Sequence, residues 1–127
     1  MSVADYYENK ILDHMLRAQS FTPPTTVYVA LYTVAPSDSG GGTEVSGGSY
    51  ARQPVTFSAA SGGSITNSAD ITFPQATADW GTIVAVGLFD ASTAGNLLWY
   101  GNLTTSKTVN SGDIFKISAG NLTVSLD

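Results

Sequence analysis

Residues 81–90 have the sequence GTIVAVGLFD, which is the longest apolar run in the chain. The apolar side chains follow one another too continuously for a strand with one solvated face. The run therefore predicts a strand that is buried on both faces, at the centre of a sheet. A turn signal, AGN at 94–96, leads from it into the apolar stretch LLWY at 97–100. This order predicts an antiparallel hairpin and indicates a mainly β fold.

Shorter strand-like segments lie on both sides of this hairpin. The clearest is VYVALYT at 27–33, in which β-branched and aromatic residues nearly alternate. The others are 50–57, where Pro54 indicates an edge or a bulge, and 70–73, 107–109, 114–117 and 122–126. Turn residues separate these segments roughly every 8–12 residues, as in β-sandwiches. We expect residues 27–126 to form an antiparallel β-sandwich of jelly-roll type, within a single domain that spans residues 1–127.

A helix is predicted at residues 3–18. Ser2 is suited to cap its first turn, Asp5 and Glu8 follow in the first turns, and Arg17 lies in the last, as the helix dipole prefers. One face of this helix carries apolar residues and the single histidine: Val3, Ala4, Tyr7, Ile11, His14, Met15 and Ala18. Leu12 and Leu16 extend this face into a wider apolar arc. Such a wide arc indicates a helix covered on more than one side, by its own domain and a neighbouring subunit, or a core helix overlaid by a loop.

The region from Ser37 to Ser49 consists almost entirely of Gly, Ser, Thr and acidic residues, so we expect a long loop with a role in contacts or in disorder. Its glycine spacing is similar to that of a phosphate loop. However, Gly48 stands where the lysine is required, and a strand follows instead of a helix, so nucleotide binding is excluded. Asp38 and Glu44 lack the ligand spacing of a calcium loop, and we expect neither a metal nor a cofactor.

The composition restricts the function further. Ser and Thr total 30 of 127 residues, charged residues total only 15, and the net charge is −5. The five cations are scattered and form no basic stripe, so nucleic-acid binding is not expected. The sequence has no apolar run of about 20 residues and no secretion signal, which predicts no membrane contact and assembly in a cytoplasm. The absence of cysteine excludes disulfides and thiol chemistry.

No set of catalytic residues emerges from the sequence. His14 is the single histidine, and no nucleophile elbow accompanies it. Asp70, Asp79 and Asp90 lie at strand ends, where the acids of a glycosidase can also lie, and the sequence does not give their separation. The alternative is that Asp70, Asp90 and Asp113 accept backbone N–H bonds in turns. We favour this alternative and expect no enzymatic activity.

Several longer stretches carry a resemblance to a known family. They are YENKILDH at 7–14, FTPP at 21–24, VYVALYT at 27–33, GTEVSGGSYARQ at 42–53, DITFP at 70–74, WG at 80–81, GLFD at 87–90 and GNLL at 95–98. Together they resemble a small structural-protein family of tailed bacteriophages and prophages, whose members are commonly labelled tail fibre proteins. The resemblance extends over essentially the whole chain. It implies a virion protein that is assembled in the cytoplasm of a bacterial host, and it supplies no catalytic residues.

Two positions on the virion fit such a protein. The first is a capsid decoration or cement protein that forms a homotrimer, binds the major capsid protein and stabilises the head. The alternative is a tail fibre or another tail or baseplate component involved in host attachment, with tail proteins or a host surface glycan as partners. Of the two, we favour a capsid decoration protein. The candidate interface residues are Tyr6, Tyr7, Ile11, His14, Met15, Glu44, Tyr50 and Arg52.

Overall fold

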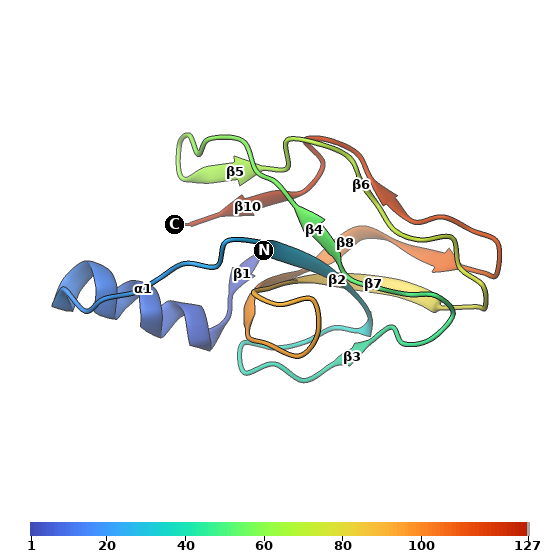
Figure 1. Cartoon of the computed structure of the whole chain (residues 1–127), viewed down its shortest axis with the longest axis horizontal. Coiled ribbons are helices and arrows are strands. Elements are labelled where there is room, and N and C mark those ends of the chain that lie inside the picture. The colour runs from blue at the N-terminus through green and yellow to red at the C-terminus, as the bar shows by residue number, and fades with distance from the viewer. Residues whose placement is uncertain (127) are drawn as a thin grey trace.

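The computed structural model describes residues 1–126, and its main element is an antiparallel sheet of six strands (Figure 1). Three long strands form the centre of the sheet: β2 (Val27–Val34), β7 (Gly81–Phe89) and β8 (Leu97–Val109). Strand β1 (Ser2–Val3) pairs with β8 at one edge, and β3 (Thr43–Glu44) and β4 (Gln53–Val55) pair with β2 at the other. The predicted central strand is confirmed, because β7 lies between β2 and β8.

A second layer covers one face of this sheet. It consists of two antiparallel pairs, β5 (Ser64–Thr66) with β10 (Thr123–Ser125) and β6 (Ile71–Thr72) with β9 (Lys116–Ile117). Figure 1 shows β5, β10 and β6 above the main sheet. The structure confirms a mainly β, antiparallel single domain with one helix. Within residues 1–126 the second layer is two separate pairs of strands, which differs from the continuous second sheet of a jelly roll.

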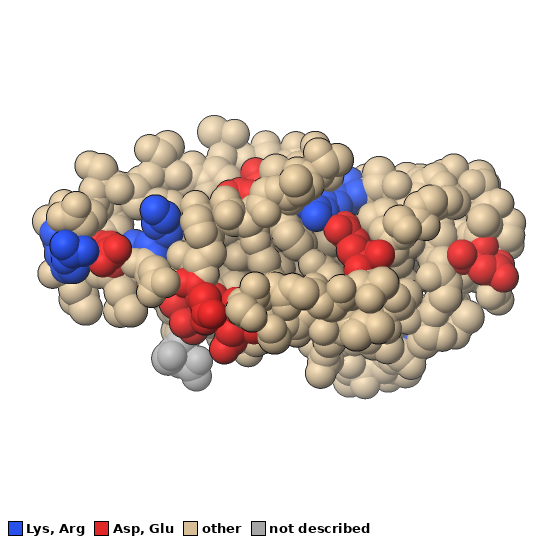
Figure 2. All heavy atoms as spheres, turned by 90° about the horizontal axis from the view of Figure 1, so that it is seen from below, with Lys and Arg blue, Asp and Glu red and all other residues tan. Residues whose placement is uncertain are grey.

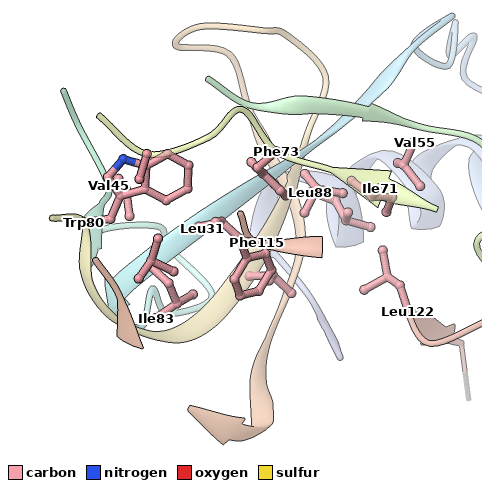
Figure 3. Close-up of a cluster of buried hydrophobic side chains, with 14 of the residues drawn as sticks. Leu31, Val45, Val55, Ile71, Phe73, Trp80, Ile83, Leu88, Phe115 and Leu122 are labelled. Atoms are coloured by element: carbon pink, nitrogen blue, oxygen red, sulfur yellow. The ribbon is translucent and has the colours of Figure 1, made fainter. Parts of the chain in front are cut away.

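The main core lies between the two layers. Alternate residues of the central strands, including Val29, Leu31 and Leu88, point into it. Figure 3 shows Phe73 and Phe115 in the middle of this cluster, with Trp80 towards one end. A smaller cluster occupies the opposite face of the sheet and consists of Ala4, Ala30, Tyr32, Ala85, Phe89 and Leu97. Both faces of the central strands are therefore buried, as the continuous apolar run predicts.

Several strands differ from the sequence-based expectation: β5 was not expected, and β6, β9 and β10 are shorter than the segments expected for them. Strand β8 continues from Leu97 to Val109, whereas separate segments at 97–100 and 107–109 were expected. Its pairing with β7 shifts register between Ile83 and Ala85, so residues 103–106 of β8 lie opposite the single residue Val84 as an irregularity of the bulge type. The segment expected at 50–57 keeps only three residues as β4, and its Pro54 lies on an edge strand, as expected.

The helix, α1, spans Asp5–Arg17 and lies within the expected range of residues 3–18. The expected cap is wrong: Ala4 is the N-cap residue, and no side chain caps the first turn. Ser2 has a different role, since it pairs with Tyr100 of β8 as part of β1. The pairing of β1 with β8 positions the first turn of the helix instead. The Ala4 N–H, at the N-cap, donates to the Leu98 carbonyl. No helix of the described chain is long and apolar enough to span a bilayer.

The helix projects from the sheet, and the segment that follows it runs back alongside (Figure 1). Near its start, the Tyr7 ring packs edge-on against Trp99 and Phe21, with centroid distances of 5.2 and 5.4 Å. None of the helical residues is buried. The large apolar side chains of the other flank are exposed to 55% for Leu12, 69% for Met15 and 79% for Leu16. Within residues 1–126, the helix is therefore covered on one flank, and the second covering that its wide apolar arc predicts is not provided by the chain itself.

The region from Ser37 to Ser49 contains β3 and a bridge between Ser37 and Gly40. Its conformation depends on Gly42, which has a φ of +72°. A Cβ atom at this position would lie 2.5 Å from the Val34 carbonyl oxygen and 2.8 Å from the Pro36 nitrogen. Both neighbours are backbone atoms that cannot rotate away, so only glycine fits without movement of the chain.

We expect Gly42→Ala to lower the free energy of unfolding by roughly 1–3 kcal/mol, because it adds a backbone clash to the strain of a left-handed conformation. Urea denaturation measures the loss. Gly41→Ala is the matched control: Gly41 has nearly the same φ, +76°, but an added Cβ meets nothing within 4 Å. Equal losses in both variants would show that the contact with Val34 and Pro36 has no effect.

Candidate functional site

A polar pocket of about 470 Å³ lies on the face of the sheet opposite the second layer. Its floor is Tyr32, Phe89 and Leu97, and its walls come from the start of α1, from β3 and from three loop segments. The wall residues are Asp5, Tyr6, Asp38, Ser39, Gly40, Gly41, Gly42, Glu44, Arg52, Gly95 and Asn96. Figure 2 views the molecule from below, and charged side chains form only small groups on that side. We refer to this site as the polar pocket.

Gly87 of β7 makes the floor of the pocket possible. A Cβ atom there would lie 3.0 Å from the Leu97 side chain, 3.0 Å from the Tyr32 ring and 3.3 Å from the Phe89 ring. The missing side chain leaves space for these three groups to close over the strand. The rings of Tyr32 and Phe89 lie nearly parallel, with an interplanar angle of 14° and centroids 6.5 Å apart. The floor is thus a flat aromatic surface held by the sheet.

One wall of the pocket is a network around Glu44 and Arg52. The Arg52 Nε and Nη2 atoms donate to the two Glu44 carboxylate oxygens, each over 2.9 Å. Arg52 Nη1 donates to the carbonyls of Ala91 and Ala94 in the β7–β8 hairpin, over 3.0 and 2.7 Å. The guanidinium carbon lies 3.8 Å from the centroid of the Phe89 ring. With only 8% of its side chain exposed, Arg52 connects β3 to the hairpin.

Tyr50 extends the same network towards the core. Its hydroxyl donates to Glu44 over 2.6 Å and accepts a bond from the Leu31 N–H over 3.0 Å. Burial acts to raise the pKa of Glu44, but the hydrogen bonds from Arg52 and Tyr50 and the attraction of the guanidinium outweigh it, so the pKa is lowered. Burial and the bond to Glu44 raise the pKa of Tyr50. Glu44 and Arg52 therefore form a charged pair at neutral pH.

Tyr32 in the floor has a polar group without a partner. Its residue is 4% exposed, and its hydroxyl makes no hydrogen bond with any residue from 1 to 126. Burial and the negative charge of Glu44 raise the pKa of Tyr32 to about 12. The hydroxyl therefore carries its proton at neutral pH and is available as a donor.

A second, apolar pocket of about 360 Å³ lies between the layers, beside the start of α1. It is bordered by Tyr7, Phe57, Ile65, Trp99 and Leu126, among others. The indole Nε1 of Trp99 is buried and has no hydrogen-bond partner in the described chain. This pocket offers apolar contact and, apart from that group, little chemistry.

The expected interface residues fall into two groups. Tyr6, Tyr7, Ile11, His14 and Met15 all lie on α1, whereas Glu44, Tyr50 and Arg52 form the network described above. Tyr6 is exposed and borders the polar pocket. The exposed imidazole of His14 bonds to the carbonyl of Gln19 through Nδ1, within its own helix terminus. Their role in contacts with partners stays a prediction.

The three carboxylates considered for catalysis, and Asp113, accept hydrogen bonds from backbone N–H groups in turns. The oxygens of Asp70, Asp90 and Asp113 accept the N–H groups of Ala119, Asn96 and Asn110, over 2.8, 2.7 and 2.9 Å. The expectation of backbone acceptors is confirmed for these three. Asp79 does the same for Ser111, over 2.8 Å. The four carboxylates thus serve three turns, because Asp79 and Asp113 both accept N–H groups of the turn at 110–113.

The sequence analysis did not identify Tyr32, Asn96 or Asp38 as residues that border one pocket. Tyr32 lies in a strand whose alternation indicates core, and Asn96 reads as a turn residue. The available signal was Gly87, a glycine inside a strand, which often marks a close approach of other groups. No group of three His, Cys, Asp or Glu residues in the described part of the chain could hold a metal ion.

The chain is similar to one known protein family over nearly its whole length. Residues 2–125 match the sequence profile of a family described as podophage GP4 fiber I protein gp80. The matched range includes α1 and all the strands of the main sheet and of the second layer. No curated protein matches the chain.

Proposed function

Because the chain belongs to the family of the podophage GP4 fiber I protein gp80, we propose that it is a subunit of a tail fibre in a phage virion and has no catalytic activity. The family match over residues 2–125 carries this proposal, since it extends over both layers and the helix. A phage structural role follows from the family itself. The fibre alternative fits the family description better than capsid decoration, which has no support from the comparison.

Labelling of virions separates the two positions. An antibody against the purified chain, conjugated to gold, is applied to particles of a phage that encodes this sequence. Electron microscopy is expected to show gold at the fibres around the tail. Gold spread over the head would overturn the fibre assignment and favour decoration, and gold absent from intact particles but present on lysed cells would overturn a virion role.

We propose further that α1 contacts other copies of the chain. Met15 and Leu16 lie three and four positions after Leu12, so both are its neighbours on the surface of the helix and the three side chains form one stripe. All three are more than half exposed, on an element that projects from the body. Burial of a leucine or methionine side chain contributes about 1.5–3 kcal/mol, which favours packing of such stripes against one another. A homotrimer through α1 is the arrangement that we expect.

We expect the double variant Leu12→Glu with Leu16→Glu to be a monomer under conditions where the natural chain is a trimer. The stripe is more than half exposed in the single chain, so the midpoint of thermal unfolding of the isolated monomer should change little. Sedimentation velocity at micromolar concentration measures the oligomeric state. Ile114→Glu, another exposed apolar position at 58%, is the control and should remain a trimer. A natural chain that is itself monomeric in this measurement would contradict the proposal.

A further inference from the structure

The apolar pocket between the layers lies at the base of α1, where the helix joins the body. Its volume is about 360 Å³, and none of the described residues that border it is charged. Its border includes Tyr7 of α1, the adjoining Trp99 of β8, and Leu126, which is 54% exposed. An engineered cavity of about 150 Å³ holds one benzene molecule, so this pocket has room for about two leucine-sized side chains. An occupant with apolar side chains would remove its walls from water.

The chain carries side chains of this kind on the outer half of α1, residues 10–17. Leu12, Met15 and Leu16 form the exposed stripe described above, and they remain exposed although the apolar pocket lies at the base of the same helix. A stripe and a pocket that do not meet within one chain can meet between two copies. Such a contact joins two different surfaces, and it closes into a ring of three when the copies are related by a threefold rotation.

The base of α1 is acidic. Glu8 and Asp38 border one surface cavity, which shares Ser125 and Leu126 with the apolar pocket. Asp5 is next to them, since its N–H donates to the Asp38 carbonyl over 2.9 Å. None of these three carboxylates forms an ion pair with another residue from 1 to 126. The apolar pocket therefore lies beside a group of uncompensated negative charges.

The outer half of α1 has the opposite charge. It contains two exposed cations, Lys10 and Arg17, and one carboxylate, Asp13, which gives a net charge of +1 with His14 neutral. Figure 2 shows basic side chains along the outer part of the helix and a group of acidic side chains where the helix joins the body. Burial alone would be satisfied by stripes packed on one another, but three parallel helices would also bring three acidic bases together. Contact between the outer half of one helix and the base of the next pairs opposite charges instead.

We propose that the outer half of α1 of one copy docks at the base of α1 of the next copy, with its stripe in the apolar pocket. The inference rests on the proposed contact of α1 between copies and names the surface that the stripe meets. The pocket receives the leucine and methionine side chains, and the acidic base attracts Lys10 and Arg17. The contacts around the ring are then identical, because each copy both gives a helix and receives one.

Chemical cross-linking between copies tests this contact. The chain has no cysteine, so each introduced cysteine is unique. A chain with Leu16→Cys is mixed with a chain with Ala60→Cys, whose exposed residue borders the apolar pocket, and a short bismaleimide is added. We expect a product that joins one chain of each kind. Ile114→Cys, at an exposed position outside the pocket, replaces Ala60→Cys in the control and should give no product above background.

A Leu16→Cys chain that cross-links mainly to itself would show stripes packed on one another. This result would overturn the inference and leave the proposed contact of α1 between copies intact. A natural chain that is a trimer by sedimentation, with no product between Leu16→Cys and Ala60→Cys, would also overturn it. A natural chain that is a monomer would overturn both. The gold-labelling test of the fibre assignment is independent of all these outcomes.

A charge placed in the apolar pocket provides a second test. Ala60→Glu should raise the dissociation constant of the trimer about tenfold or more, because docking of the stripe would bury the new carboxylate. Ala59→Glu is the matched control: Ala59 is exposed, precedes Ala60 in the chain and does not border the pocket. It adds the same charge and should change the dissociation constant about twofold at most. Equal effects of the two variants would contradict docking in the pocket.

Discussion

Replacement of Phe73 by alanine is expected to lower the free energy of unfolding by about 3–5 kcal/mol. Phe73 is 2% exposed and follows β6 into the space between the two layers (Figure 3). Its ring stacks on Tyr50 with centroids 6.2 Å apart and meets Phe115 edge-on at 5.7 Å. The second layer consists of short pairs of strands that cannot close over the cavity, so much of the lost contact stays lost.

Urea denaturation followed by tryptophan fluorescence measures this loss. Domains of this size have a total stability of about 5–15 kcal/mol, so the alanine variant is at risk of not folding. Phe73→Leu keeps most of the volume and is expected to lose about half as much. Ile114→Ala, at an exposed apolar position, should change the stability by less than about 0.5 kcal/mol. A loss at Phe73 as small as that at Ile114 would mean that the layers are held together elsewhere.

The second large effect is expected for Arg52→Met, with a loss of about 3–5 kcal/mol at pH 7. Methionine preserves the packing on Phe89 but leaves Glu44 charged and partly buried. It also leaves the carbonyls of Ala91 and Ala94 without their donor. The penalty for an unpaired buried charge exceeds the net contribution of the pair when it is intact. The double variant Arg52→Met with Glu44→Gln should therefore be more stable than Arg52→Met alone.

The pH dependence of the free energy of unfolding tests the same network of Glu44 and Arg52. In the natural chain the pKa of Glu44 is lowered from its ordinary value of 4.5. Its charged form therefore stabilises the fold above pH 4.5, and this stabilisation is lost as the pH falls through the lowered pKa. In Arg52→Met the partner is gone and burial raises the pKa of Glu44, so the variant gains a proton more readily. The difference between the two chains should be largest near pH 7 and shrink below about pH 4.5.

Chemical denaturation at a series of pH values measures this difference. Glu44→Gln is the control, because its stability cannot depend on a carboxyl group at that position. A loss for Arg52→Met that stays constant from pH 7 to pH 3 would show that the lost packing, and not the unpaired carboxylate, accounts for the effect.

Sequence reasoning succeeded where a local pattern determines the structure. The continuous apolar run of 81–90 identifies the central strand, because only a position between two other strands buries both faces of it. Asp90 and Asp113 were recognised as turn acceptors since an aspartate beside a turn satisfies nearby N–H groups. Both features depend on neighbours within a few residues.

It failed where the outcome depends on residues far apart in the chain. Ser2 has the chemistry of a helix cap, but its pairing with Tyr100, nearly 100 positions away, takes precedence. The segment 50–52 has strand propensity, but Tyr50 and Arg52 are used by Glu44 and the hairpin loop. The polar pocket combines residues that lie far apart in the chain, from Asp5 to Leu97. No local pattern states which of these segments come together.

The strands at the two edges of the main sheet affect how closely packed copies of the chain interact. Both borders are short: β1 has two residues, β3 two, and β4 three, one of which is Pro54 with no N–H to donate. Beyond β1 the border is β8 itself, where Thr104, Thr105 and Lys107 are exposed polar residues. Long, flat, apolar borders recruit strands from other molecules and lead to aggregates. Copies held side by side at high local concentration on a particle would therefore resist fusion into a continuous sheet and remain separate folded units.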